Sequence, residues 1–248
     1  MKIVVCGCNG KMGKTVINLA SSFSDCEVAG GIDLSGVQND VFPVFELPDK
    51  IDMELDVIID FSNPSGLKGL LDYAVKNCVP LVLCTTGFSE AQVKDIKQAS
   101  KSTPIFYSRN MSLGVNLLLE LSRKAAKALG EDFDIEIIEK HHSQKIDAPS
   151  GTALMIAEEI SSCTANNFDY TYDRSVQRKP RSKNEIGIHS VRGGNIFGDH
   201  EVIFAGNNET IALSHHCGSR DVFAAGAIKA ARFVFKKEPG FYTMKDLI

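Results

Sequence analysis

The sequence has no long apolar run and no excess of positive charge, and each absence excludes a class of protein. None of its apolar stretches approaches the ~18 residues that a membrane-spanning helix needs. The formal net charge of −4 offers no attraction to nucleic acid or to an anionic membrane. Met1-Lys2 leads directly into IVVCGCNG, which is too short for the apolar core of a signal peptide. We therefore expect a cytoplasmic protein that binds neither membranes nor nucleic acid.

Zinc-site spacing is also lacking, although seven cysteines are present. Cys6, Cys78 and Cys84 lie inside apolar stretches, and the pair Cys6 and Cys8 has no second pair at the distance that a zinc site needs. We therefore expect buried, reduced thiols, as is usual in the cytosol, and no structural metal. The single basic cluster, Arg174 to Lys183, is expected to be a solvated loop.

The first part of the sequence alternates short β-branched runs with segments of helical periodicity. Strands are expected at residues 2–6, 26–33, 55–62, 79–87 and 103–110. Helices are expected at residues 14–24, 65–78 and 89–102. Because this alternation is typical of βαβ units, it predicts a Rossmann-like α/β domain with a parallel sheet and helices on both faces.

The pattern changes after about residue 112. Helices are expected at residues 114–130, 150–163 and 221–237, and strands at 134–142, 186–192, 200–206 and 209–216. Gly- and Asn-rich turns separate the last three strands, which predicts an open antiparallel or mixed sheet in an α+β domain. The polar stretch from Thr164 to Glu185 shows little periodicity. We place one domain at residues 1–112 and 220–248, and the other at 113–219.

A glycine loop follows the first strand. Gly7, Gly10 and Gly13 form a GxxGxxG pattern between a strand and a helix, where backbone N–H groups can face a pyrophosphate. Asp33 closes the second strand and can accept hydrogen bonds from both ribose hydroxyls of NAD while repelling a 2′-phosphate. Lys11 lies in the loop and could offset that repulsion, so NADH is favoured and NADPH is possible.

Two further loops follow expected strands. Because ligands of a doubly wound sheet lie beyond the carboxyl ends of its strands, these loops should line the cofactor crevice. The residues concerned are Phe61, Thr85, Thr86 and Gly87. Asn110 or Ser112 could contact the nicotinamide amide, or could simply cap a helix.

The stretch EKHHSQKIDAPSGTA combines two histidines with a lysine. If the preceding strand continues this far, His141 and His142 point to opposite faces. A metal cluster with His215 and His216 is one interpretation, but no third ligand stands at useful spacing. The other interpretation starts from the helix that follows Ser150, because an open helix N-terminus binds anions. Beside Lys145 and the imidazoles it would suit a dicarboxylate, and Lys145 or His141 could supply a proton.

This stretch resembles the E-x-H-H-x-x-K-x-D-A-P-S-G-T-A signature of the 4-hydroxy-tetrahydrodipicolinate reductase family, also called dihydrodipicolinate reductase. The glycine loop, D-F-S-x-P, T-T-G-F, N-x-S-x-G-V-N and SRDVFAAGA also occur in family order, so the resemblance covers nearly the whole chain. It implies an NAD(P)H-dependent reductase of a small cyclic dicarboxylate in lysine and diaminopimelate biosynthesis. It also implies a homotetramer built through the second domain.

The resemblance assigns roles to matching positions. His141 corresponds to the acid/base histidine and Lys145 to the proton donor. The substrate-binding positions are His142, Ser150, Gly151 and Thr152. The cofactor-binding positions are Gly7, Cys8, Asn9, Gly10, Lys11, Met12, Asp33, Phe61, Cys84, Thr85, Thr86, Arg109, Asn110, Met111 and Ser112. The first domain would bind the dinucleotide, and the second would bind substrate and oligomerise.

Three positions depart from the family pattern. Cys84 replaces a glycine near the nicotinamide, and Met111 replaces a frequent phenylalanine. Leu34 stands where some members carry a basic residue for the 2′-phosphate, which favours NADH. Two alternatives stay open: another NAD-dependent dehydrogenase of the same architecture, and a non-enzymatic NADH-sensing module.

Overall fold

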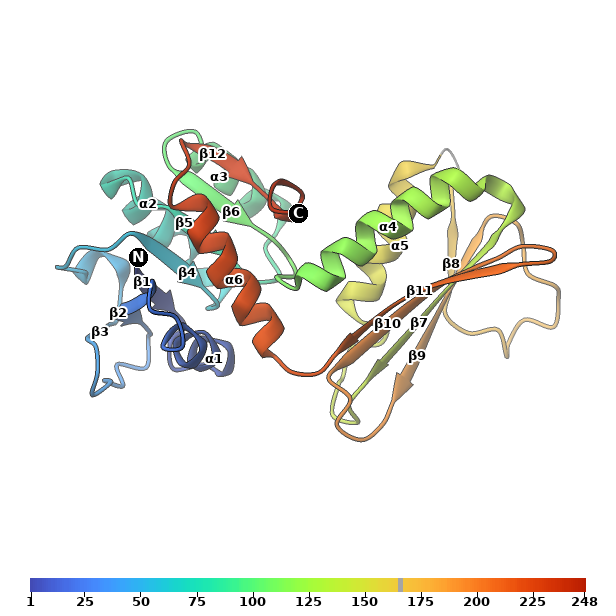
Figure 1. Ribbon diagram of the computed structural model, residues 1–248, viewed down its shortest axis with the longest axis horizontal. Coiled ribbons are helices and arrows are strands. Elements are labelled where there is room, and N and C mark those ends of the chain that lie inside the picture. Colours follow the sequence, from blue (N-terminus) through green and yellow to red (C-terminus); the bar gives the residue numbers. More distant parts are fainter. Residues whose placement is uncertain (165–166) are drawn as a thin grey trace. The chain divides into compact units, whose positions relative to one another are not determined.

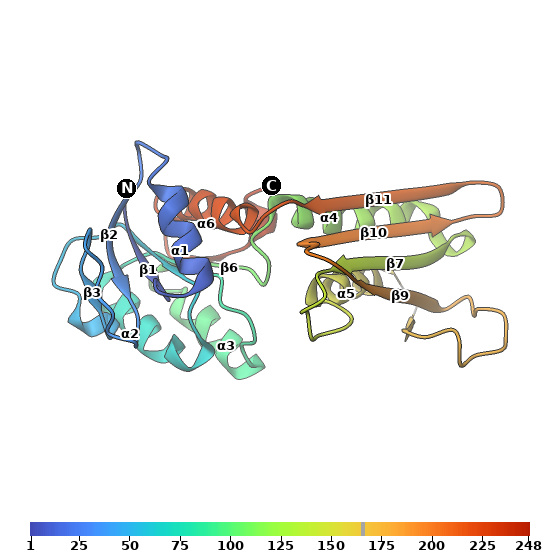
Figure 2. The same ribbon diagram turned by 90° about the horizontal axis from the view of Figure 1, so that it is seen from below.

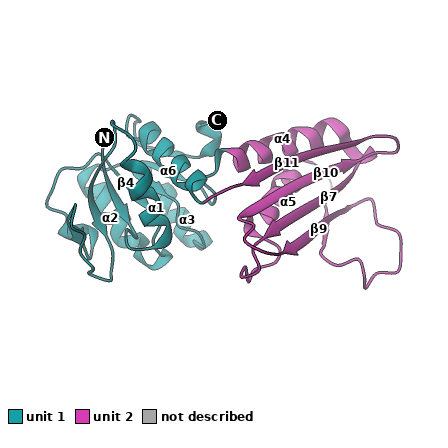
Figure 3. Ribbon diagram, turned by 60° about the horizontal axis from the view of Figure 1, so that its bottom comes forward, with its two compact units in different colours: residues 1–113, 220–248 teal, residues 114–219 magenta. Residues whose placement is uncertain are grey.

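The chain forms two compact units. The computed structural model describes residues 1–164 and 167–248. Unit 1 comprises Met1–Leu113 and Arg220–Ile248, and unit 2 comprises Gly114–Ser219 (Figure 3). Within the described residues, no helix is both long and apolar enough to cross a membrane.

Unit 1 is built on a seven-stranded sheet in which every pair of neighbouring strands is parallel. The strand order is β12-β6-β5-β4-β1-β2-β3. The strands are β1 (Lys2–Cys6), β2 (Glu27–Ile32), β3 (Val44–Phe45), β4 (Val57–Asp60), β5 (Leu81–Leu83), β6 (Pro104–Tyr107) and β12 (Gly240–Tyr242). The order reverses between β1 and β4, and this switch point is where such sheets bind ligands.

Helices cover both faces of this sheet (Figure 1). They are α1 (Lys11–Ala20), α2 (Leu67–Asn77), α3 (Glu90–Ala99) and α6 (Asp221–Val234). One apolar core joins α1 and α6 to residues such as Val5 and Ile59, and the other joins α2 and α3 to residues such as Val4 and Ile58. Because successive residues of a strand face opposite sides, strands buried on both faces are apolar throughout.

Unit 2 contains a mixed five-stranded sheet in the order β11-β10-β7-β9-β8. Its strands are β7 (Asp134–His141), β8 (Asp169–Thr171), β9 (Glu185–Arg192), β10 (Gly198–Ala205) and β11 (Thr210–Cys217). β9 is parallel to β7 and β8, whereas β10 is antiparallel to β7 and β11. The helices α4 (Leu113–Leu129) and α5 (Gly151–Cys163) pack on one face of the sheet (Figure 2).

The predicted architecture, a Rossmann-like parallel sheet with a separate mixed sheet, is confirmed. The short strands β3, β8 and β12 were not predicted. β8 lies in the polar stretch from Thr164 to Glu185, where three residues are too few to show a period. Residues 165–166 of that stretch lie outside the described residues.

The basic cluster is mostly solvated, as expected: Arg178, Lys179 and Lys183 are exposed. Arg174 and Arg181 are partly buried instead, because Arg174 pairs with Glu136 and Glu185, and Arg181 pairs with Asp134.

One local expectation was wrong: Cys78 is exposed, not buried, because it forms the C-cap of α2 in the left-handed conformation (φ 54°). All seven cysteines are free thiols, and Cys6 and Cys84 are buried as expected.

Candidate active site

The loop between β1 and α1 requires glycine at two positions. Gly7 has a φ of +75°, and a Cβ atom there would lie 2.7 Å from the carbonyl oxygen of Phe61. A Cβ atom on Gly13 would overlap the carbonyl oxygen of Gly7, so α1 approaches the loop closely only without a side chain. Gly10 is the N-cap of α1 and provides no side-chain cap. The loop therefore fits a pyrophosphate, which its backbone N–H groups would bind.

Asp33 directly follows β2 and is tied to the glycine loop. Its Oδ2 accepts a hydrogen bond from the Asn9 backbone N–H (3.1 Å), and its Oδ1 accepts from the Ser35 backbone N–H (3.0 Å) and hydroxyl (2.6 Å). Although partial burial opposes its charge, the hydrogen bonds from Ser35 and Asn9 hold the pKa of Asp33 below its ordinary value. Asp33 is therefore an ionised acceptor, which fits a ribose with free hydroxyl groups.

A pocket of about 410 Å³ opens beyond the carboxyl ends of β4, β5 and β6. It brings together the predicted cofactor residues Met12, Phe61, Cys84, Thr85, Thr86, Arg109, Asn110 and Met111. Ser62, Arg220 and Phe223 also line it and were not assigned from the sequence. The last two come from the start of α6, and their only sequence signal was the SRDVF motif.

The remaining predicted cofactor residues lie outside this pocket. Cys8 is buried against the backbone of Gly31, and Lys11 is exposed at the first position of α1. Ser112 is buried, and its backbone N–H donates to the Asn110 side chain over 2.9 Å. This bond fixes the turn that precedes α4, which begins at Leu113.

Two buried acids lie at the carboxyl ends of the strands. Asp60 is 2% exposed, and burial raises the pKa of its carboxyl. Its Oδ1 accepts from the backbone N–H (3.0 Å) and hydroxyl (2.5 Å) of Ser62, which fixes the turn after β4. Burial also raises the pKa of the Cys84 thiol well above its ordinary value, which favours its protonated form.

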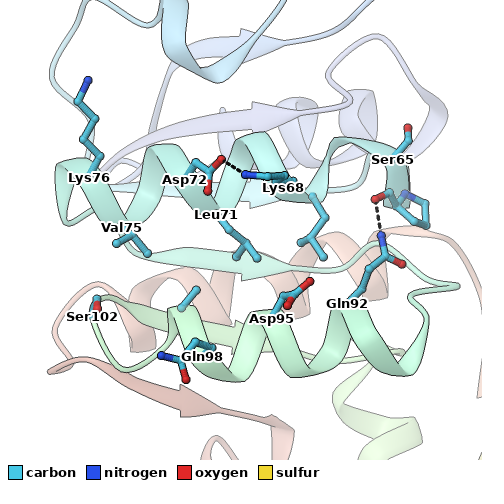
Figure 4. A pocket seen from close by; sticks show the side chains of 13 residues that line it. Ser65, Lys68, Leu71, Asp72, Val75, Lys76, Gln92, Asp95, Gln98 and Ser102 are labelled. Atoms are coloured by element: carbon cyan, nitrogen blue, oxygen red, sulfur yellow. Dashed lines mark hydrogen bonds and ion pairs between the residues drawn. The ribbon is translucent and has the colours of Figure 1, made fainter.

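A groove of about 690 Å³ lies between α2 and α3 (Figure 4). Several of its polar side chains pair with neighbours. Gln92 donates to the carbonyl oxygen of Pro64 over 2.7 Å, and Lys68 pairs with Asp72 over 2.6 Å. The groove contains none of the predicted site residues.

In unit 2, His141 is the last residue of β7 and lies on the helix-covered face with Glu139. Its Nδ1 is 2.6 Å from Glu139 Oε2. Arg192, at the end of β9, donates to both oxygens of Glu139 over 2.7 Å each. Burial opposes the charge of Glu139, but the hydrogen bonds that it accepts, chiefly from Arg192, lower its pKa to about 2. Burial lowers the pKa of His141, which Glu139 offsets only in part.

His142 and Lys145 lie in the segment that follows β7. Because the strand ends at His141, the expected alternation of faces does not extend to His142. The backbone N–H of Lys145 donates to the carbonyl oxygen of His142 over 3.1 Å. Lys145 Nζ donates to Asp147 Oδ1 over 2.8 Å, and Arg192 donates to the Asp147 carbonyl oxygen over 2.7 Å. Lys145 and His141 thus belong to one hydrogen-bond network, which runs through Asp147, Arg192 and Glu139.

The start of α5 is joined to the same network. Ser150 is the N-cap: its Oγ accepts from the Ala153 N–H over 3.1 Å, and its own N–H donates to Glu139 Oε1 over 3.1 Å. Its Oγ also shares a hydrogen bond of 2.9 Å with His200 Nε2. A Cβ atom on Gly151 would meet no atom within 4 Å. The helix therefore begins at open space, where its N-terminus favours an anion.

The metal interpretation receives no support from these positions. Residues 1–164 and 167–248 contain no group of three or more His, Cys, Asp or Glu side chains that could hold a metal ion. His200, not His215 or His216, packs against His141, with ring centroids 5.2 Å apart. His216 instead pairs with Asp199 over 2.5 Å.

Sequence reasoning missed Glu139, Arg192, Asp147 and His200 as parts of this site. Glu139 had a usable signal, because it stands two residues before His141 on a strand and so shares its face. Arg192 and His200 come from β9 and β10, and only the register of the folded sheet brings them here.

Comparison with known proteins identifies the family. The family model for the N-terminus of dihydrodipicolinate reductase matches residues 1–111, and the model for its C-terminus matches residues 114–248. The chain belongs to the dihydrodipicolinate reductase family. Its relatives named 4-hydroxy-tetrahydrodipicolinate reductase include proteins of Caldanaerobacter subterraneus (50% identical, 100% of this chain and 98% of the relative) and Clostridium tetani (49%, 100% and 97%).

The dihydrodipicolinate reductase fold is also found among solved structures. The dipicolinate-bound dihydrodipicolinate reductase of Paenisporosarcina sp. TG-14 matches with a TM-score of 0.84 at 24% identity, over 100% of this chain and 99% of that one. A diaminopimelate dehydrogenase of C. glutamicum matches with a TM-score of 0.58 at 13% identity, over 100% and 94%, which reflects the fold alone. The predicted family and enzyme class are confirmed: the chain is an oxidoreductase that uses a pyridine nucleotide.

Proposed function

We propose that the chain reduces 4-hydroxy-tetrahydrodipicolinate to tetrahydrodipicolinate in the lysine and diaminopimelate pathway of the cytoplasm, with NADH favoured over NADPH. When bound, the reduced nucleotide supplies the hydride. One observation carries the proposal: a single hydrogen-bonded network in unit 2 holds His141, Lys145 and the open start of α5. The first is a base, the second an acid, and the third an anion site.

Unit 1 would bind the nucleotide. The glycine loop would bind the pyrophosphate, and Asp33 would accept from the ribose hydroxyls. Leu34 follows Asp33, is 78% exposed, and offers no charge to a 2′-phosphate. Lys11 is the basic residue of the loop that supports some use of NADPH. We therefore expect Asp33→Ala to reduce the preference for NADH, and Lys11→Ala to raise the KM for NADPH more than that for NADH.

Unit 2 would bind the substrate. A substrate carboxylate would lie at the start of α5, against the backbone of Gly151 and Thr152, with His142 beside it. Hydride transfer leaves an electron-rich carbon that must gain a proton, and Lys145 or His141 would supply it. Binding through the carboxylates would also orient the ring for hydride transfer.

Unit 2 would also form the homotetramer. The sheet face opposite α4 and α5 carries alternate residues of β7 and β10, including Ile138, which pairs with Glu201, and Ile203, which pairs with Glu136, so that the two isoleucines lie diagonally across the strands. Association through this face would cover it. Light scattering after size-exclusion chromatography should give four times the 27.0 kDa of the chain.

A coupled assay tests the activity. A synthase generates the substrate, and the fall in nucleotide absorbance is followed with NADH and NADPH in parallel. Oxidation of NADH that depends on the synthase is expected. No oxidation of either nucleotide would overturn the proposal. Calorimetric titration with pyridine-2,6-dicarboxylate tests substrate binding alone, and Gly193→Ala, at a position where a Cβ meets no atom within 4 Å, serves as its control.

A further inference from the structure

The Glu139 carboxylate connects more parts of the site than any other described group in unit 2. Its side chain is completely buried. Oε2 accepts from His141 (2.6 Å) and Arg192 (2.7 Å), and Oε1 accepts from Arg192 (2.7 Å) and the Ser150 N–H (3.1 Å). We propose that Glu139 is a positioning residue for the reduction: it fixes His141 with its proton on Nδ1, so that Nε2 is the atom that meets the ligand.

The direction of the hydrogen bond between His141 and Glu139 follows from charge. Arg192 contributes two N–H donors to the carboxylate, and an ionised carboxylate only accepts hydrogen bonds. His141 Nδ1 must therefore donate. In a neutral imidazole the other nitrogen is then an acceptor, and the two nitrogens cannot exchange roles while Glu139 stays ionised.

The Nε2 atom of His141 faces Gly198, which has no side chain. A Cβ atom on Gly198, the first residue of β10, would lie only 3.0 Å from it. None of the hydrogen bonds between described residues uses this nitrogen. In this tautomer Nε2 presents a lone pair, so a neutral His141 holds a ligand N–H or O–H and does not itself donate. The proton that reaches the substrate would then come from Lys145, an inference that rests on the proposed function.

The same carboxylate also places the other two parts of the site. It receives the N–H of Ser150, the residue that starts α5. Through Arg192, which donates to the Asp147 carbonyl oxygen, it holds the segment that carries Lys145. The ion pair between Glu139 and Arg192 thus sets the positions of base, acid and anion site, which is the arrangement that a preorganised site needs.

Nitrogen-15 NMR of the full-length protein tests the tautomer without substrate. Histidine is labelled at both ring nitrogens, and His141→Asn identifies the signals of His141. We expect a protonated Nδ1 and an unprotonated Nε2 in the wild type, and loss of that pattern in Glu139→Gln, whose amide can donate to Nδ1. A protonated Nε2 in the wild type, or an unchanged pattern in Glu139→Gln, would overturn the proposal.

Kinetics separate positioning from simple structural support. Glu139→Gln leaves Arg192, whose side chain is 20% exposed, without its charge partner, whereas Glu139→Gln/Arg192→Met removes both charges. We expect kcat to fall at least ~10-fold in both variants, while the double variant recovers much of the unfolding midpoint that the single variant loses. Recovery of kcat together with the midpoint would mean that Glu139 only stabilises the fold.

Glu185→Gln is the matched control. Glu185 is 5% exposed, pairs with Arg174, and lies at the opposite end of β9 from Arg192. We expect a lower unfolding midpoint and an unchanged kcat. A comparable fall in kcat would show that any lost buried ion pair in unit 2 has this effect, and would overturn the proposal. If the wild type shows no turnover, the proposed function fails, but the NMR result still decides the tautomer.

Discussion

Gly226 lies in α6 so close to Met111 that a Cβ atom on it would overlap the Met111 carbonyl oxygen. Met111 lines the pocket beyond the carboxyl ends of β4, β5 and β6. We expect Gly226→Ala to push this segment away from α6, lowering the free energy of unfolding by about 1–3 kcal/mol, as overpacking does. NADH affinity should fall as well. Denaturant unfolding and a fluorescence titration with NADH measure the two effects, and unchanged values for both would contradict the predicted overlap.

Gly69 in α2 provides the control for Gly226, because alanine at this position should change the free energy of unfolding in the opposite direction. It is exposed, and a Cβ atom there would meet nothing within 4 Å. Alanine lowers the conformational entropy of the unfolded chain without any clash in the helix. We expect Gly69→Ala to raise the free energy of unfolding by about 0.5–1 kcal/mol. NADH affinity should stay unchanged, and a destabilised variant would show that this part of α2 is not open.

His200 should make stability depend on pH. Burial lowers its pKa to about 4, and the nearby His141 acts in the same direction. Between pH 6.5 and 4 the unfolded chain takes up a proton that the folded chain does not, so stability falls as pH falls. For this group alone the loss between pH 7 and 5 is about 2 kcal/mol. Urea unfolding at pH 7 and pH 5 measures this loss in unfolding free energy, which should be smaller by about that amount in His200→Gln. An equal loss in both proteins would refute the assignment.

Some of the candidate active site could be predicted from sequence and some could not. The glycine loop and Asp33 were predicted because a nucleotide site needs local backbone geometry, which the spacing of residues indicates. His141 and Lys145 were predicted from a continuous motif. Arg192 and His200 were not, because each reaches the site only through strand register set by the whole sheet. Register depends on the burial of many residues together, and no short pattern encodes it.

The same reasoning explains the errors in the fold. Cys78 was expected to be buried because it lies among apolar residues, but it ends α2 in the left-handed conformation of a C-cap and is exposed. The ion pairs of Arg174 were not predicted, because its partners, Glu136 and Glu185, are separated from it by 38 and 11 residues. Gly187 makes room for this pairing, since a side chain there would overlap the Glu136 carboxylate.

Lys145→Ala and His141→Ala should each lower kcat at least ~100-fold, the range typical of acid/base groups. Lys140→Ala is the control, because Lys140 neighbours His141 in β7 but lies on the opposite face of the strand. We expect its kcat to match the wild type. The coupled assay measures all three variants under saturating NADH. Near-normal turnover in Lys145→Ala or His141→Ala would remove that residue from the mechanism.

Gly198→Ala isolates the Nε2 atom of His141 from the rest of the network. The new methyl group would lie 3.0 Å from Nε2, tighter than an ordinary van der Waals contact, so either the ring or the methyl must shift by a few tenths of an ångström. Glu139 resists a shift of the ring because it holds Nδ1 at 2.6 Å. We therefore expect a folded protein whose kcat falls about 10-fold or more, since the methyl covers the atom that meets the ligand. Gly193→Ala, in the β9–β10 connection just before Gly198, adds a methyl with no atom within 4 Å and should retain the wild-type kcat. Equal kcat in Gly198→Ala and the wild type would mean that the ligand does not approach Nε2 from β10.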